Sequence, residues 1–166
     1  DTPIYGRGDE VEHQYESQGW KALARYPSDD PSGGHFSCHD GNLVAVYGSP
    51  SQTVDSGFAT ELFENPEDLL CQTDGTFLAV GINPSDERVV IGTDKLGARP
   101  CYYVPDQSVF GTTVAACLPQ IEPTVDTQAL ADFLHLGHLW GTRTLVQEVK
   151  AMRPATVYTY KNEDWQ

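Results

Sequence analysis

Short apolar runs separated by turn residues predict a chain built mostly of strands. Runs rich in Val, Ile and aromatic residues predict strands at 20–26, 34–38, 42–48, 75–82, 87–93, 100–104, 109–113 and 156–160. Turn-forming residues predict tight connections at His39–Asn42 and at Asn83–Asp86. Residues 1–19 carry only a weak pattern, 114–118 fit a helical turn, and 145–149 fit a short extended or helical piece.

Two segments follow the spacing of a helix. Apolar residues between 58 and 70 predict a helix that is interrupted at Asn65-Pro66, because proline lacks the N–H that a continuing helix needs. Residues 127–136 predict a second helix with Asp126 or Thr127 as its N-cap. Many strands together with few helices indicate an α+β protein of layered sheets.

The acidic composition changes the expected environment of the protein. The 166 residues, which by length form one domain over 1–166, include 24 Asp and Glu against 10 Lys and Arg, for a net charge of −14. Acidic side chains that are spread along the whole chain repel one another, and concentrated salt screens that repulsion. The composition therefore predicts a salt-adapted protein or, as the alternative, an ordinary acidic protein of the cytosol. Nucleic acid is not an expected partner, because its binding needs clustered cations.

Other sequence signals exclude several classes of protein. No apolar run approaches membrane-spanning length, and residues 1–20 lack the pattern of a signal peptide, so a cytoplasmic protein is expected. His35, Cys38 and His39 lack a fourth ligand at a suitable spacing, so no metal site is expected. We interpret the four cysteines as buried, reduced thiols; they are Cys38, Cys71, Cys101 and Cys117.

The most specific motif of the chain lies around the strand pair at 75–93. Asp74-Gly75-Thr76-Phe77-Leu78-Ala79 opens the pair, and Thr93-Asp94-Lys95-Leu96-Gly97-Ala98-Arg99-Pro100-Cys101-Tyr102-Tyr103 follows it. This arrangement resembles the core of the class II glutamine amidotransferases, in particular the glutaminase domain of asparagine synthetases. Leu130–Gly137, Trp140–Leu145 and Val149–Pro154 are similar to blocks that are particular to asparagine synthetases, and the resemblance covers about residues 33–160.

The resemblance implies a fold and a set of partners. The expected fold is a four-layer αββα sandwich of two antiparallel sheets, like that of the N-terminal-nucleophile hydrolases, in a haloarchaeal-like member of the family. The expected partner is an ATP-pyrophosphatase synthetase domain, in the same or a separate polypeptide, which would use ATP and Mg²⁺ in asparagine biosynthesis. That domain is not within residues 1–166, and no cofactor is expected in the chain itself. A homodimer is a further partner that the family allows.

The family reaction implies an N-terminal Cys as the nucleophile, and this sequence has no Cys at the corresponding position. An N-terminal Cys thiolate attacks the glutamine amide, with its own α-amine as the base. The family start aligns with Asp1–Gly6, where Thr2 falls at the position of the Cys and Pro3 replaces a Gly. Thr2 would become a nucleophile only after removal of Asp1. The alternative interpretation is that this segment is an ordinary first strand without catalytic function.

Two other catalytic features are altered or ambiguous. The Asn-Gly-Glu motif that would stabilise the tetrahedral intermediate should follow the strand at 42–48, where the chain reads Gly48-Ser49-Pro50. These residues are interpreted as a turn, with Gly48 and Ser49 as candidates for binding substrate. Asp55 stands near the Asp that holds the glutamine α-amine in the family, but an Asp just before a helix also serves as an N-cap. The two interpretations of Asp55 stay open.

The retained motif is interpreted as structural. Asp94 and Gly97 suit a tight turn, Arg99 suits a bidentate pair with Asp94 or another acid, and Pro100 completes the motif. The sequence therefore predicts a glutaminase-type domain that is degenerate for hydrolysis and serves a structural or regulatory role. Its alternatives are an active glutaminase that uses Thr2 or an upstream nucleophile, and a module that binds a small ligand such as glutamine.

Overall fold

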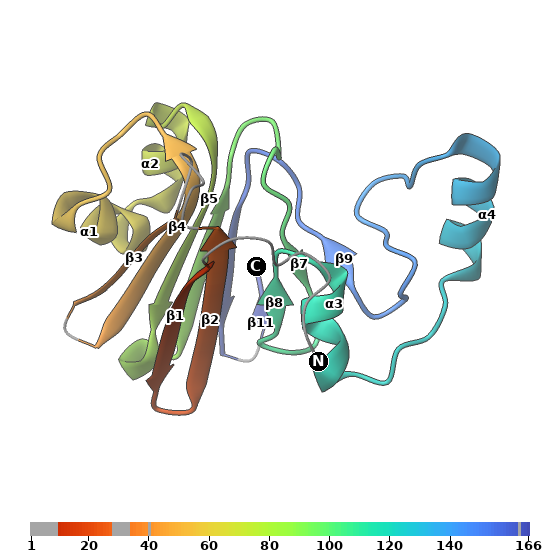
Figure 1. Cartoon of the computed structure of the whole chain (residues 1–166), viewed down its shortest axis with the longest axis horizontal. Coiled ribbons are helices and arrows are strands. Elements are labelled where there is room, and N and C mark those ends of the chain that lie inside the picture. The colour runs from red at the N-terminus through yellow and green to blue at the C-terminus, as the bar shows by residue number, and fades with distance from the viewer. Residues whose placement is uncertain (1–9, 28–33, 40, 163) are drawn as a thin grey trace.

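A six-stranded antiparallel sheet forms the centre of the molecule (Figure 1). The computed structural model describes residues 10–27, 34–39, 41–162 and 164–166. The strand order across the sheet is β11-β10-β6-β5-β4-β3. Its strands are β3 (Gly34–His39), β4 (Asn42–Pro50), β5 (Gly75–Asn83), β6 (Arg88–Thr93), β10 (Val157–Lys161) and β11 (Asp164–Trp165).

Two smaller antiparallel sheets accompany the main one. The hairpin consists of β1 (Glu10–Ser17) and β2 (Trp20–Pro27). The three-stranded sheet has β7 (Tyr102–Tyr103) in its centre, between β8 (Phe110–Gly111) and β9 (Lys150–Ala151). Because β9 comes from the end of the chain, this sheet joins segments about 50 residues apart in the sequence.

The helices follow the predicted positions closely. The segment predicted to break at Asn65-Pro66 forms α1 (Ser56–Glu64) and α2 (Pro66–Gln72), with Pro66 as the first residue of α2. The second predicted helix is α4 (Thr127–Leu136), and the carboxylate of Asp126 accepts from the backbone N–H of Ala129 as its cap. The other helices are α3 (Val114–Cys117) and the 3-10 turns η1 (Pro84–Asp86) and η2 (Leu118–Gln120).

Alternation along β5 assigns its side chains to two separate cores. Phe77 and Ala79 pack against α1 and α2, which cover one face of the main sheet. Leu78 and Ile82 point to the opposite face, where they share a core with Tyr15 of the hairpin. This second core also takes in residues from β7 and β8 of the small sheet.

A third hydrophobic core lies on the far side of the small sheet. Val104, Cys117 and Val149 are buried together between the small sheet and α3. The order of layers is therefore α1 and α2, the main sheet, the smaller sheets, and α3. This arrangement confirms the predicted α+β sandwich of antiparallel sheets. Among the residues that the structure describes, no helix combines the length and hydrophobicity needed to cross a bilayer.

Some strand predictions were wrong. Residues 1–19 were predicted to have only a weak pattern, but they contain β1. This strand gives no clear apolar pattern, because the only described buried side chain of β1 is Tyr15 and most of its other residues are polar. Pairing with β2 and an ion pair between Glu12 and Arg25 at 2.6 Å stabilise this strand instead. The strands predicted at 100–104 and 109–113 are only two residues long as β7 and β8.

Candidate functional site

The turn after β6 is organised by one buried carboxylate. Asp94 is 1% exposed, and Oδ1 accepts from the backbone N–H groups of Leu96 at 2.8 Å and Ala98 at 3.2 Å. Its Oδ2 accepts from the N–H of Arg99 at 3.3 Å and of Phe77 in β5 at 3.2 Å. An ionised carboxylate suits this position because it offers acceptors only. Asp94 therefore closes the turn and attaches it to the neighbouring strand.

Gly97 lets the turn lie against the segment before β10. Its φ is +63°, and a Cβ at this position would approach Cγ of Pro154 to 2.8 Å. The carbonyl of Asp94 accepts from the N–H of Gly97 at 3.1 Å and from that of Ala155 at 2.9 Å. Pro100 follows at the exposed end of the turn. These contacts are in keeping with a structural interpretation of the motif.

Arg99 connects this turn to β4. Its Nη1 donates to the hydroxyl of Tyr47 at 3.0 Å, and the guanidinium carbon lies 4.3 Å from the centre of the Tyr47 ring. The sequence favoured a bidentate pair with Asp94 or another acid. In the structure the contact of Arg99 with Asp94 is made by its backbone N–H, while the guanidinium is directed to Tyr47.

Gly48 and Ser49 lie in β4 rather than in a free turn. Ser49 stands opposite Thr76 and Pro50 opposite Gly75 in the ladder with β5. Gly48 has a φ of +110°, and a Cβ on it would lie 2.2 Å from the Thr76 carbonyl oxygen. A Cβ on Gly75, whose φ is +108°, would lie 2.1 Å from the Ser49 carbonyl oxygen. The two strands thus approach each other so closely here that both positions require glycine.

The connection after β4 is bonded to the residue that precedes β5. The Ser51 N–H donates to the carbonyl of Asp74 at 2.7 Å, and the Ser51 hydroxyl accepts from the Asp74 N–H at 2.9 Å. Lys95 of the Asp94 turn forms an ion pair with the Asp74 carboxylate. The end of β4, the start of β5 and the Asp94 turn therefore form one hydrogen-bonded unit.

Asp55 caps a helix. Its Oδ1 accepts from the backbone N–H of Phe58 at 3.0 Å at the start of α1, and its side chain is exposed. This geometry is that of an N-cap, which was one of the two interpretations. Thr2 lies outside the described residues. The structure therefore brings Gly48, Ser49 and Asp94 together where β4 and β6 end and β5 begins, and Asp55 follows β4 a few residues later.

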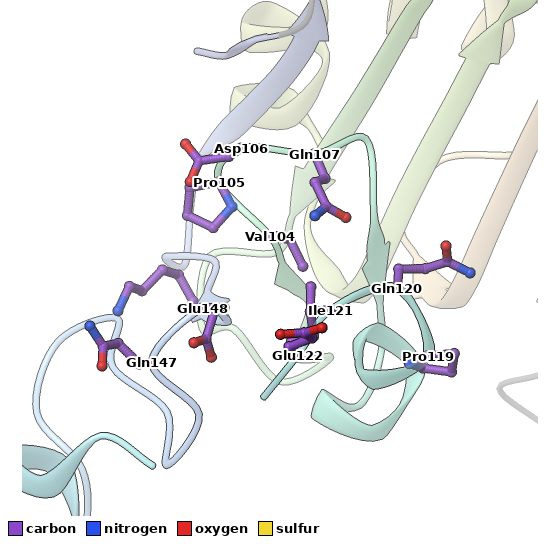
Figure 2. Close-up of a pocket in the computed structure, with 11 residues that line it drawn as sticks. Val104, Pro105, Asp106, Gln107, Pro119, Gln120, Ile121, Glu122, Gln147 and Glu148 are labelled. Carbon is purple, nitrogen blue, oxygen red and sulfur yellow. The ribbon is translucent and has the colours of Figure 1, made fainter. Parts of the chain in front are cut away.

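A further cleft is lined by other residues (Figure 2). Its volume is about 710 Å³, and three loops line it with Val104, Pro105, Asp106, Gln107, Pro119, Gln120, Ile121, Glu122, Gln147, Glu148 and Lys150. Figure 2 shows Glu122 beside Ile121 in the middle, with Glu148 on one side and Gln120 on the other. None of the residues singled out from the sequence lines this cleft. No periodic pattern links the three loops, so sequence reasoning had no signal for it.

Three of the four charged residues that line the cleft are acidic, namely Asp106, Glu122 and Glu148. Glu148 accepts hydrogen bonds from the hydroxyl and the backbone N–H of Thr124, and these bonds hold the pKa of its carboxyl below the usual range. Lys150 is the only cation among the lining residues. A second cavity of about 360 Å³ lies between α1 and the β3–β4 hairpin, and Ser56, next to Asp55, is among its lining residues.

The cysteines correct one sequence interpretation. Cys101 and Cys117 are buried as expected, but Cys38 and Cys71 are exposed, and all four are free thiols. Burial, with a smaller effect of the neighbouring Cys117, raises the pKa of Cys101 to about 12. Cys101 therefore stays protonated at neutral pH and is unsuited to act as a nucleophile. Within the described part of the chain, no group of three or more His, Cys, Asp or Glu side chains is placed to hold a metal ion.

The profile of the glutamine amidotransferase domain family matches residues 58–166, which begin within α1 and include β5, the Asp94 turn and the remainder of the chain. A search of curated proteins finds no match to the sequence. The matched region covers more than half of the chain, and it contains the motif from which the resemblance was first inferred.

Proposed function

Because this chain belongs to the glutamine amidotransferase domain family, we propose that it is the glutaminase-type domain of an asparagine synthetase-like protein and has lost glutamine hydrolysis. Its role is then structural or regulatory, beside an ATP-dependent domain that forms the amide. That partner belongs to the same or a separate polypeptide and carries the ATP and Mg²⁺. The net charge of −14 supports the cytoplasm of a salt-adapted, haloarchaeal-like organism as the setting.

The main support for the proposed loss of hydrolysis is the sequence at the end of β4. The family reaction implies an Asn side chain here that donates to the negatively charged oxygen of the tetrahedral intermediate. The residues present, Gly48-Ser49-Pro50, offer no side-chain amide, and Pro50 has no N–H. Loss of one such donor typically lowers turnover by about 100–1000-fold. The close approach of Gly48 to Thr76 gives this glycine a backbone role that is independent of catalysis.

Retention of the family motif is consistent with a structural role for its residues. The side chain of Asp94 is fully engaged by backbone N–H groups, and Arg99 lies on Tyr47. Asp55 has a capping role that accounts for its position without a substrate. These contacts stabilise the fold whether or not glutamine is hydrolysed, so the motif can persist in a domain without activity.

The proposal is tested by ammonia release from glutamine. The chain is compared with a variant that lacks Asp1 and carries Thr2→Cys, which would start with a free thiol and amine. We expect neither protein to release ammonia above the background of heat-treated protein, because the donor motif is altered as well. Thermal unfolding with and without about 10 mM glutamine reports binding separately from turnover.

Each other outcome contradicts the proposal in a different way. Ammonia release by the unmodified chain that disappears in Thr2→Ala would identify an active glutaminase. Release by the Thr2→Cys variant alone would show that the rest of the machinery is intact. A glutamine-dependent rise in Tm without ammonia release would identify a ligand-binding module. In that case Asp55→Asn, which keeps a capping oxygen but removes the charge, tests whether Asp55 holds the α-amine.

A further inference from the structure

The cavity of about 360 Å³ between α1 and the β3–β4 hairpin, called the α1 cavity below, is lined mainly by polar side chains. Figure 1 shows α1 at the end of the molecule where β3 forms the edge of the main sheet. Hydroxyl, amide or carboxyl groups are carried by six of the nine lining residues, Ser37, Asn42, Ser56, Thr60, Glu64 and Asn83. The α1 cavity can therefore form several hydrogen bonds to a bound molecule.

One wall of the α1 cavity is a single side of α1. Ser56, Thr60 and Phe63 line it, and their i, i+4, i+7 spacing places them on the same side of the helix. Asp55 caps the first turn, and Nη1 of Arg88 donates to the carbonyl of Phe63 at 2.8 Å near the last turn. Because both ends of α1 are bonded in this way, the wall is held in a fixed position.

Phe63 supplies an aromatic ring to this wall. The ring lies on the backbone of β5, since a Cβ at Gly81 would come within 2.8 Å of the Phe63 Cζ atom. Phe63 is half-buried, so part of its surface remains available on the side of the α1 cavity. The apolar surface of such a ring can pack against the C–H groups of a ligand.

Two asparagines lie at the end of the α1 cavity that the sheet provides. Leu43 is opposite Ile82 in the ladder of β4 and β5, so Asn42 and Asn83 are the next residues along the two strands. Oδ1 of Asn83 accepts from the N–H of Asp86 at 3.0 Å, which leaves the amide NH₂ group as a donor. Within the described part of the chain, the side chain of Asn42 has no hydrogen-bond partner.

The hydroxyl groups complement these amide donors. Thr60 donates its hydroxyl hydrogen to the carbonyl of Ser56 at 3.0 Å, and Ser37 donates to the carbonyl of Val44 at 3.5 Å. The oxygen atoms of both hydroxyls keep lone pairs that can accept further bonds. The α1 cavity thus offers donors and acceptors side by side. A ligand hydroxyl matches this mixture, because it donates and accepts at the same atom.

The charge and size of the α1 cavity limit the ligand further. Glu64 is its only charged lining residue, and no Lys or Arg lines it. An anionic ligand such as a sugar phosphate would find no counter-charge there and would be repelled by a chain whose net charge is −14. Pockets for small molecules usually measure about 300–1,000 Å³, so this cavity suits a ligand at the small end of the range.

We propose that the α1 cavity binds a small neutral polyol of the size of a monosaccharide. Asn42 and Asn83 donate to its hydroxyl groups, the hydroxyl oxygen of Thr60 accepts from them, and the ring of Phe63 packs against its C–H groups. The cavity is separate from the residues inferred for glutamine, because Asn42 and Gly48 are about 20 Å apart along β4 at 3.3 Å per residue. The inference does not depend on the proposed loss of glutamine hydrolysis.

Isothermal titration calorimetry of the full chain with D-glucose, D-galactose, D-mannose and D-ribose tests the proposal. We expect at least one of these sugars to bind once per chain with a Kd of about 10 mM or lower. Saturation of the heat signal distinguishes binding from the general exclusion of sugars from protein surfaces. The phosphate ester of the sugar that binds should have a Kd at least about 10-fold higher, because no cation lines the cavity.

Variants locate the bound sugar. Asn42→Leu removes the amide and Thr60→Val removes the hydroxyl with little change of shape, so each should raise the Kd at least about 5-fold. The matched control is Gln72→Leu, which removes an exposed amide from α2 outside the cavity and should change the Kd less than about 2-fold. Glu64→Gln should also have little effect, since a neutral ligand does not depend on the charge. Circular dichroism checks that each variant is folded.

Three results would overturn the proposal. None of the four sugars might give a saturable signal at concentrations up to about 50 mM, which excludes a polyol site of useful affinity. Binding that survives both Asn42→Leu and Thr60→Val, or that Gln72→Leu weakens equally, would lie elsewhere on the chain. Binding of ethanolamine in place of the sugars, lost in Glu64→Gln, would assign the α1 cavity to an organic cation.

Discussion

The guanidinium of Arg99 lies over the ring of Tyr47, 4.3 Å from its centre, and donates to the hydroxyl of the same residue. The two residues are 52 positions apart, so the contact fixes the Asp94 turn against the end of β4. Tyr47 directly precedes Gly48, one of the two glycines at which β4 and β5 approach each other closely. One network therefore supports the end of β4 and the start of β5, where the candidate residues lie together.

Asp94 should contribute strongly to stability. Asp94→Asn replaces one acceptor oxygen by a donor that faces backbone N–H groups, so buried donors lose their partner. Because bonds to a charged acceptor and buried unpaired groups are each worth about 1–3 kcal/mol, we expect a loss of roughly 3 kcal/mol in the free energy of unfolding. Urea denaturation followed by circular dichroism measures the loss.

Asp74→Asn is the matched control for Asp94→Asn. Asp74 is exposed, and its carboxylate forms a surface ion pair with Lys95. Exposed pairs contribute about 1 kcal/mol or less. Equal losses in the two variants would contradict the assignment of Asp94 as the organising residue of the turn.

Gly48 should tolerate no side chain. Gly48→Ala combines a positive φ with a Cβ placed 2.2 Å from a carbonyl oxygen of the adjacent strand, so β4 and β5 must separate. We expect a loss of about 3 kcal/mol or more in the free energy of unfolding. Gly19→Ala has a similar φ of +86° with nothing within 4 Å, and it should lose only about 1 kcal/mol. Similar losses at the two sites would show that the close approach is unimportant.

Local signals in the sequence predicted the parts of the fold that local chemistry determines. Pro66 marked the break between α1 and α2, and Asp126 marked the start of α4. β1 was missed because pairing with β2 stabilises it although it is mostly polar. β11, only two residues long, is too short for a pattern and depends on its pairing with β10.

The candidate site was harder to predict from the sequence than the helices, because its contacts join residues that are far apart in the chain. The motif at Asp94 was recognisable, but its bond to Phe77 and the contact of Arg99 with Tyr47 join strands that only the fold brings together. The sequence identified Asp55 as a cap or a clamp, and the structure adds the capping bond. Burial was wrongly predicted for Cys38 and Cys71, because the residue type alone does not establish burial in space.

Salt should stabilise the protein at neutral pH. The net charge of −14 destabilises the compact state by self-repulsion, and raising KCl from about 0.1 M to 2 M shortens the Debye length to a few ångströms. We expect a gain of about 1 kcal/mol or more, which raises Tm by roughly 3 °C. Differential scanning calorimetry measures the change.

Acidification provides the control for the salt effect. Near the pI of about 4.4 the net charge approaches zero, so added KCl should have much less effect on Tm there. A salt effect of the same size at both pH values would mean that screening of the net charge is not its cause.

Alkaline pH should destabilise the protein through Cys101. Burial raises the pKa of this thiol from 9.0 to about 12, so between these values the unfolded chain ionises while the folded chain keeps its proton. The unfolded state then binds fewer protons, and the free energy of unfolding falls as pH rises. This stabilising contribution is fully present below pH 9, and it should be lost by about 1 kcal/mol per pH unit above that value.

Cys101→Ala isolates the contribution of Cys101 from those of other groups. Burial also raises the pKa of Tyr103 and of Cys117, and these groups affect both proteins alike. Urea denaturation at pH 8 and pH 10 should therefore show a smaller decrease in Cys101→Ala than in the wild type, although the variant is less stable at both values because of the cavity left in the core. An equal decrease in the two proteins would show that Cys101 ionises as readily in the folded state as in the unfolded state.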